Sequence, residues 1–209
     1  MSKILFKTIV GSHLWGMQHE GSDTDYFVCY VTDTKNLLLN NSKEMKSSFN
    51  SDTDKNIDIS KHEIGGLIAG LESGNWNYLV GLFGIVVESS PEHKWLKKYI
   101  KNNPIKIYYN AVRGMAIQNY KKYIENDKDS SPERIQKITR SIEFMIRYLD
   151  TGKINFKPSK GKTKEDLLKE LDALDKAYLA STLPAKLGKK PLEDFLLKLR
   201  IKMLKHSTS

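Results

Sequence analysis

Short apolar runs alternate with polar turns along the N-terminal part of the chain, which is typical of strands and short connections. Residues 3–10 (KILFKTIV) and 25–31 (DYFVCYV) are rich in β-branched and aromatic side chains, so each run predicts a strand. The segment 57–59 (IDI) predicts a third, short strand. The stretch 40–56 is polar and rich in Ser, Asn and Asp, and it predicts a loop.

Later in the chain the apolar positions recur at helical spacing. Ser131-Pro132-Glu133 is a strong helix start, because it combines a serine cap, a proline in the first turn and an early acid. The pattern predicts helices over these ranges: 13–17, 64–74, 105–124, 131–149, 162–181 and 192–204. The order of elements predicts an α+β protein, with a small mixed sheet flanked by helices over residues 1–92 and an α-helical domain over residues 93–209.

The net charge of +9 is unevenly spread. Residues 1–92 contain 7 Lys and Arg against 12 Asp and Glu, a net −5, so the remaining residues, 93–209, carry +14. A basic helical half is suited to a polyanion, because Lys and Arg neutralise phosphates. The alternative is that the lysine-rich helices present ordinary solvated faces.

Cys29 is the only cysteine, which excludes an internal disulfide and a multi-cysteine zinc site. No apolar run approaches the roughly 20 residues that a membrane span requires. The start of the chain also lacks a signal-peptide core followed by a small-residue cleavage site. We therefore expect a cytoplasmic protein with no membrane partner.

The candidate chemistry lies at the junction of the first two strands. Gly11-Ser12 follows the first strand, where glycine lets the backbone approach a phosphate and serine adds a hydroxyl donor. Asp23 and Asp25 precede the second strand, and residues two apart on a strand point to the same face. Two such carboxylates would repel each other unless a cation such as Mg²⁺ lay between them. An ordinary loop–strand junction is the alternative interpretation.

This arrangement resembles the DNA-polymerase-β-type nucleotidyltransferase superfamily, whose signature is Gly-Ser, a spacer and then Asp-x-Asp. More narrowly, the chain is similar to the predicted nucleotidyltransferases of an RNA-repair pathway. The narrower likeness extends over about residues 4–170 and rests on these further matches: Gly16, Ser22, Asp58-Ile59, Gly74-Asn75, Gly114-Met115-Ala116, Tyr120-Lys121, Lys137, Arg140 and 147–154 (RYLDTGKI).

The resemblance implies a role for each matching residue. Asp23 and Asp25 would hold Mg²⁺ or Mn²⁺, and Asp58 would be the third carboxylate, acting on the attacking hydroxyl. Asp52 and Asp54 are alternative candidates for the third carboxylate. We favour Asp58 because the isoleucines on either side of it predict a strand, and a strand fixes the direction of the Asp58 side chain.

Gly11 and Ser12 would bind the triphosphate in the same scheme. His13 stands where the family often has a basic residue, and a structural role for it is an equal alternative. Lys137 and Arg140 are three residues apart and share a helical face, from which they would reach the triphosphate or an RNA backbone. Their alternative role is a solvated basic face.

The implied reaction is transfer of a nucleoside monophosphate from a nucleoside triphosphate to an acceptor hydroxyl, with release of pyrophosphate. The basic helical half and the family favour the end of an RNA, such as a tRNA-like or cleaved RNA, as the acceptor. Two alternatives stay open: nucleotidylation (AMPylation) of a protein hydroxyl, and a catalytically inactive, basic RNA-binding module.

Overall fold

The computed structural model describes residues 2–39, 48–52, 56–159 and 161–206. The chain divides into two compact units. Unit 1 comprises residues 1–72, 77–99 and 188–209, and unit 2 comprises residues 73–76 and 100–187. The described residues therefore place the C-terminal segment with the N-terminal sheet. This division differs from the predicted boundary at residue 92, because residues 93–99 and 188–209 belong to unit 1.

Unit 1 is built on a mixed sheet whose described strands have the order β3-β4-β2-β1-β5. The strands are β1 (Lys3–Ile9), β2 (Thr24–Val31), β3 (Ser48–Asp52), β4 (Ile57–Glu63) and β5 (Ile85–Ser89). Neighbouring strands are antiparallel except β2 and β4, which run parallel. The predicted strands at 3–10, 25–31 and 57–59 are confirmed. The predicted loop at 40–56 is wrong where β3 forms, and residues 40–47 and 53–55 lie outside the described residues.

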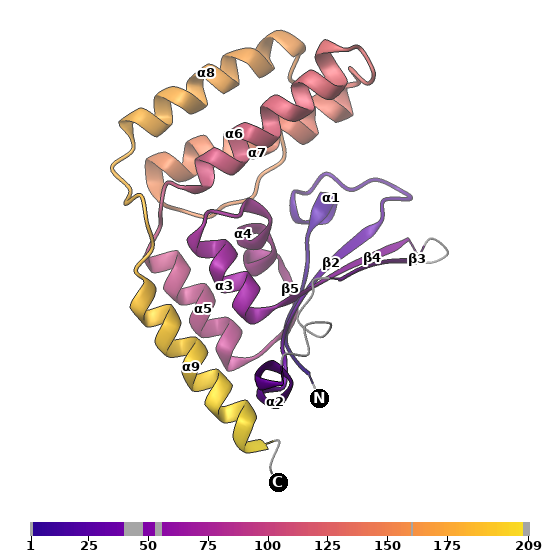
Figure 1. Cartoon of the computed structure of the whole chain (residues 1–209). Helices are drawn as coiled ribbons and strands as arrows, with labels where there is room; N and C mark the ends of the chain where they lie inside the picture. Colours follow the sequence, from indigo (N-terminus) through magenta and orange to yellow (C-terminus); the bar gives the residue numbers. More distant parts are fainter. Residues whose placement is uncertain (1, 40–47, 53–55, 160, 207–209) are drawn as a thin grey trace. The chain divides into compact units, whose positions relative to one another are not determined.

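Helices pack on one face of this sheet (Figure 1). They are α3 (Ile64–Glu72), α4 (Trp76–Phe83) and α5 (Pro91–Asn102), with α9 (Lys189–His206) beyond them and two short helices, α1 (Gly11–Leu14) and α2 (Thr34–Leu38), at strand ends. The Thr8 hydroxyl of β1 donates to the Gly81 carbonyl of α4 over 2.7 Å. A Cβ at Gly81 would overlap the ring of Phe27 in β2, so glycine permits this close helix–sheet contact.

Unit 2 is helical, as expected from the 3.6-residue periodicity. It contains α6 (Tyr108–Asn119), a π-helix η3 (Tyr120–Glu125), α7 (Pro132–Thr151) and α8 (Lys164–Ala180). The Ser131 hydroxyl accepts from the Arg134 amide at the start of α7, which confirms the predicted cap. Asp175 of α8 accepts hydrogen bonds from Tyr109 and Arg113 of α6, and this interaction fixes α8 against α6.

Candidate active site

Asp25 and Asp58 are direct neighbours on the parallel strands β2 and β4. Paired residues on adjacent strands lie about 4.8 Å apart and point to the same face, so the two carboxylates share one side of the sheet. Farther along β2, the same face carries the buried Phe27 and Cys29, which pack under the helices. The two acids therefore lie at the end of the helix-covered face, where the apolar core gives way to half-exposed positions.

Gly11 follows β1 after a single residue, Val10, and lies against Asp25. Its φ of 62° is in the left-handed region, and a Cβ there would overlap the Asp25 carboxylate. The Val10 amide donates to the Asp25 carbonyl over 2.9 Å, which fixes the end of β1 beside the start of β2. The sequence motif is thus a packing unit, in which glycine leaves room for an acid on the neighbouring strand.

Asp23 lies just outside the sheet, in an exposed position. The β2 strand begins at Thr24, whose amide donates to the Asn56 carbonyl over 2.8 Å. Before it, a turn is closed by the His19 amide donating to the Ser22 hydroxyl over 2.9 Å and the Ser22 amide donating to the His19 carbonyl over 3.0 Å. Asp23 is two residues from Asp25, but the described residues contain no group of three His, Cys, Asp or Glu side chains arranged to hold a metal ion.

The strand register shows that Asp58 and Asp52, the two candidates for the third carboxylate, lie on opposite faces of the sheet. Asp52 of β3 is paired with Ile57 of β4, one residue before Asp58. Successive side chains on a strand point to opposite faces, so Asp52 lies on the face opposite that of Asp25 and Asp58. Asp54 lies outside the described residues.

The side chains of Ser12 and His13, which follow Gly11, can form hydrogen bonds with a ligand. The Nε2 atom of His13 is buried and has no hydrogen-bond partner among the residues that the structure describes. Ser12 is half-buried, and its backbone carbonyl accepts hydrogen bonds from the amides of Trp15 and Met17. A buried, unpaired imidazole nitrogen costs free energy, which a ligand group hydrogen-bonded to it would offset.

Lys137 and Arg140 belong to unit 2, whereas the carboxylates belong to unit 1. Both lie on α7, three residues apart on the helix. The ammonium of Lys137 is 2.6 Å from the carboxylate of Glu133 in an exposed pair of the i,i+4 type. Such a pair contributes little stability, so Lys137 can exchange Glu133 for a phosphate at small cost.

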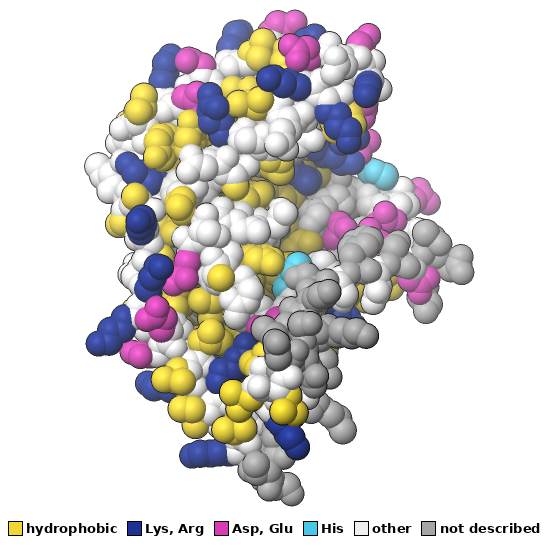
Figure 2. Space-filling view, viewed as in Figure 1, with side chains coloured by type: hydrophobic (Ala, Val, Ile, Leu, Met, Phe, Trp, Pro, Cys, Tyr) yellow, Lys and Arg dark blue, Asp and Glu magenta, His cyan; other side chains and the backbone are white. Residues whose placement is uncertain are grey.

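The donor set around Asp25 fits a divalent cation such as Mg²⁺. Mg²⁺ prefers hard oxygen ligands, and it keeps several bound water molecules when one or two carboxylates bind it. Figure 2 shows acidic side chains gathered over the end of the sheet where α1 and the starts of β2 and β4 lie.

A comparison with protein-family models identifies the family of this chain. The model of the RNA repair pathway DNA polymerase beta family matches residues 1–155. The chain belongs to this family. It is therefore a nucleotidyltransferase of the polymerase-β-like superfamily, and its mixed sheet with flanking helices is consistent with that fold. A search of curated proteins finds no match. Among the described residues, no helix is both long enough and apolar enough to cross a membrane.

The charge of the sequence is also divided between the two units. Unit 2 contains 18 Lys and Arg against 11 Asp and Glu, a net charge of +7, whereas unit 1 carries the remaining +2. The positive excess predicted for the C-terminal half thus belongs mainly to the helical unit. On the face shown in Figure 2, Lys and Arg are interspersed with Asp and Glu and do not form one continuous patch.

Proposed function

We propose that this nucleotidyltransferase transfers a nucleoside monophosphate from a nucleoside triphosphate to the terminal hydroxyl of an RNA. The observation that carries the proposal is the direct pairing of Asp25 with Asp58, beside a glycine whose missing Cβ makes room for Asp25. Asp25 therefore lies next to Gly11, and Asp58 lies beside Asp25 one strand farther along the sheet. The family to which the chain belongs supports a nucleotidyl transfer at such a site.

In the proposed reaction the oxygen of the acceptor hydroxyl forms a bond to the α-phosphorus of the triphosphate. The bond from this phosphorus to the oxygen bridging the α- and β-phosphates breaks, and pyrophosphate leaves. Asp58 accepts the proton of the hydroxyl as general base. Ser12, His13 and the Gly11 backbone bind the triphosphate.

Asp23, Asp25 and Asp58 would hold Mg²⁺ or Mn²⁺, which neutralises the charge developing on the phosphates. Lys137 and Arg140 of α7 bind phosphates of the triphosphate or of the RNA backbone. RNA is the acceptor class because the family is one of RNA repair and unit 2 carries a net charge of +7. Binding through phosphates releases counterions, so we expect RNA affinity to fall steeply between low and moderate salt.

The test is a transfer assay with each of the four labelled triphosphates, Mg²⁺, total RNA and cell protein, followed by ribonuclease or protease treatment. We expect label that ribonuclease removes and protease does not. Label removed only by protease would overturn the RNA assignment and indicate a protein hydroxyl as acceptor. A complete lack of transfer with every triphosphate would contradict the proposed reaction and leave an RNA-binding module.

A matched pair of variants tests the site itself. Asp58→Asn removes the proposed base, and we expect transfer to fall by about 10²–10⁴-fold. Asp52→Asn makes the same chemical change on the opposite face of the sheet, and we expect activity within about threefold of the unchanged protein because Asp52 cannot reach the site. Equal losses in the two variants would show that Asp58 has no special role.

A further inference from the structure

Asn56 adopts a left-handed backbone conformation at the point where β4 begins. Its φ is 50°, and among the residues that the structure describes only Asn56 and Asp127 combine a positive φ with a side chain. This region costs free energy for any residue that has a Cβ, although Asn and Asp tolerate it better than other residues do. Such conformations cluster at functional sites, where the surrounding structure holds them in place. The two residues differ in what their conformations position.

The carbonyl of Asn56 holds the start of β2. It accepts a hydrogen bond from the Thr24 amide over 2.8 Å. Thr24 and Ile57 are the first paired residues of the parallel strands β2 and β4, and the next pair is Asp25 and Asp58. The hydrogen bond therefore closes the strand pair at the end where the two carboxylates lie.

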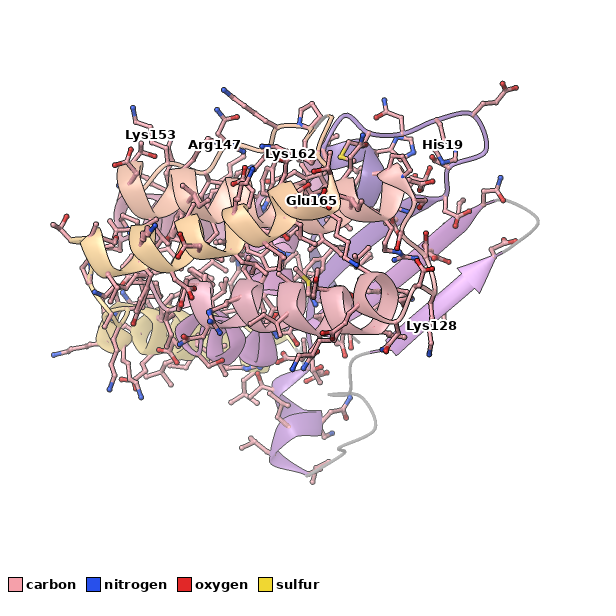
Figure 3. The ribbon with its side chains drawn as sticks, turned by 90° about the horizontal axis from the view of Figure 1, so that it is seen from above. His19, Lys128, Arg147, Lys153, Lys162 and Glu165 are labelled. Carbon is pink, nitrogen blue, oxygen red and sulfur yellow. The ribbon has the colours of Figure 1, made fainter. Side chains whose placement is uncertain are left out.

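The donor of this hydrogen bond lies between two of the acids. Thr24 is the first residue of β2, with Asp23 before it and Asp25 after it. Before Asp23 the chain forms the turn that contains His19, which is labelled in Figure 3. Without the bond from Thr24 to Asn56, the segment that carries both acids would lose its first link to β4.

The position of the Asn56 carbonyl depends on the left-handed conformation. The peptide group is planar, so the carbonyl turns whenever the backbone dihedrals of Asn56 change. Asn56 is exposed, so burial of its side chain does not explain the conformation. Glycine adopts this conformation without steric cost, whereas a β-branched residue strongly disfavours it. The choice of residue at this position therefore controls the direction of the carbonyl.

We propose that Asn56 is a positioning residue for the transfer reaction. Its left-handed conformation holds the start of β4 against Thr24 and so sets where Asp58 lies relative to Asp25. This inference rests on the proposed nucleotidyl transfer, because the two carboxylates are those assigned to that reaction. The alternative explanation is that Asn56 only allows the chain to enter β4, with no effect on the acids.

Asp127 provides a matched control in the other unit. Its φ is 52°, it is exposed like Asn56, and its amide donates to the Ile124 carbonyl over 3.2 Å at the end of η3. Figure 3 labels its neighbour Lys128. The proposed reaction gives no role to Asp127. Valine at either position therefore introduces the same backbone strain, once beside the carboxylates and once in unit 2.

The kinetic test uses the full chain with Mg²⁺ and the triphosphate that it transfers, at a temperature where each variant is folded. Asn56→Val should lower kcat at least tenfold and change the KM for the triphosphate less than threefold, because the Gly11-Ser12 turn is unaltered. Asn56→Gly should keep kcat within about threefold, since glycine retains the conformation without the side chain. Asn56→Ala should show a smaller loss than Asn56→Val and replaces it if the valine variant does not fold.

The control separates positioning from loss of stability. Asp127→Val should lower the melting temperature about as much as Asn56→Val but leave kcat within about twofold. Equal losses of kcat in these two variants would overturn the inference. A loss of kcat in Asn56→Gly equal to that in Asn56→Val would overturn it as well, because the side chain and not the backbone conformation would then be responsible.

Two NMR readouts do not require transfer activity. The Thr24 amide should exchange its hydrogen at least tenfold faster in Asn56→Val, and at nearly the unaltered rate in Asn56→Gly and Asp127→Val. Bound Mn²⁺ speeds the relaxation of nearby amides with a steep distance dependence. The ratio of this effect at Asp58 to that at Asp25 should change at least twofold in Asn56→Val alone.

These readouts also separate the inference from the proposed function. Unchanged Thr24 exchange and an unchanged Mn²⁺ ratio in Asn56→Val would overturn the inference and leave the transfer reaction in place. If the unaltered chain transfers no nucleotide, the proposed function fails, and the two NMR readouts alone decide whether Asn56 positions the carboxylates.

Discussion

Gly11 and Gly16 adopt the same left-handed conformation, with φ of 62° at each, but their surroundings differ. A Cβ at Gly11 would overlap the Asp25 carboxylate, whereas a Cβ at Gly16 would have nothing within 4 Å. The sequence suggests that Gly11 is needed for a phosphate to approach. The structure gives a further reason, which is that a carboxylate from the neighbouring strand occupies the space of a side chain.

This difference gives a matched prediction. Gly16→Ala should cost about 1–2 kcal/mol in the free energy of unfolding, from backbone strain alone. Gly11→Ala should cost at least as much and should also displace Asp25, so transfer activity should fall by more than tenfold while Gly16→Ala keeps most of it. Urea unfolding and the transfer assay measure the two effects separately. If both variants retained activity, the contact between Gly11 and Asp25 would have no catalytic importance.

At the scale of elements, a buried histidine joins strand β5 to helices α4 and α5. His93 is 2% exposed and stacks on Phe6 with ring centroids 4.1 Å apart. Its Nε2 lies 3.1 Å from the Leu82 carbonyl and its Nδ1 lies 2.8 Å from the Ser89 hydroxyl. A carbonyl only accepts, so Nε2 carries the proton and Nδ1 can accept from Ser89. Burial lowers the pKa of His93 below its usual 6.5, which favours this neutral form.

Stability should therefore decrease as the pH falls below about 7. The unfolded chain binds a proton at His93 as the pH passes 6.5, while the folded protein stays neutral there, so the unfolded state gains protons first. We expect the free energy of unfolding to drop as the pH falls from about 7 through 6.5 and below, by at most about 1.4 kcal/mol per pH unit for one histidine. His93→Gln, measured by urea unfolding across this range, should flatten the dependence.

His62 adds to the same trend, because burial also lowers the pKa of its imidazole. The pH dependence that remains in His93→Gln should therefore decrease again in the double variant with His62→Gln. An NMR titration provides the direct check. A pKa of His93 at or above 6.5 in the folded protein would contradict this account.

At the scale of the whole molecule, the C-terminal helix α9 is part of the N-terminal unit. The guanidinium of Arg200 is 2.6 Å from the carboxylate of Glu63, which is only 3% exposed. Arg200 Nη1 also donates to the Thr32 carbonyl over 3.3 Å, and the Thr34 hydroxyl donates to the Arg200 carbonyl over 2.7 Å. Helix α9 therefore helps to fix the C-terminal end of β4.

Removing one partner of this buried pair should be costly. Arg200→Met leaves Glu63 buried without its cation, and we expect a loss of about 3 kcal/mol in the free energy of unfolding. Lys202→Met on the same helix breaks a more exposed pair with Glu92, in which the Lys202 side chain is 54% exposed, and should cost about 1 kcal/mol or less. Equal losses in urea unfolding would show that the Arg200–Glu63 pair does not contribute to docking α9.

The sequence alone determined the features that depend on residues close together in the chain. Strand β1, strand β2 and helix α7 follow from local periodicity and from the Ser131 cap, and the structure contains all three. The motif from Gly11 to Asp25 indicated the superfamily, because its residues lie close together in the chain, and the narrower family was indicated by further matches as far as residue 154. Local spacing also suggested a site with paired acids.

Tertiary structure alone decided which distant residues meet. Asp58 lies beside Asp25 because β2 and β4 pair in parallel, and a shift of one residue would have turned Asp58 to the other face. The polar segment Ser48–Asp52 becomes strand β3 only by pairing with β4, which overrides its weak strand propensity. The return of α9 to unit 1 likewise depends on contacts between residues far apart in the chain, which local sequence patterns do not encode.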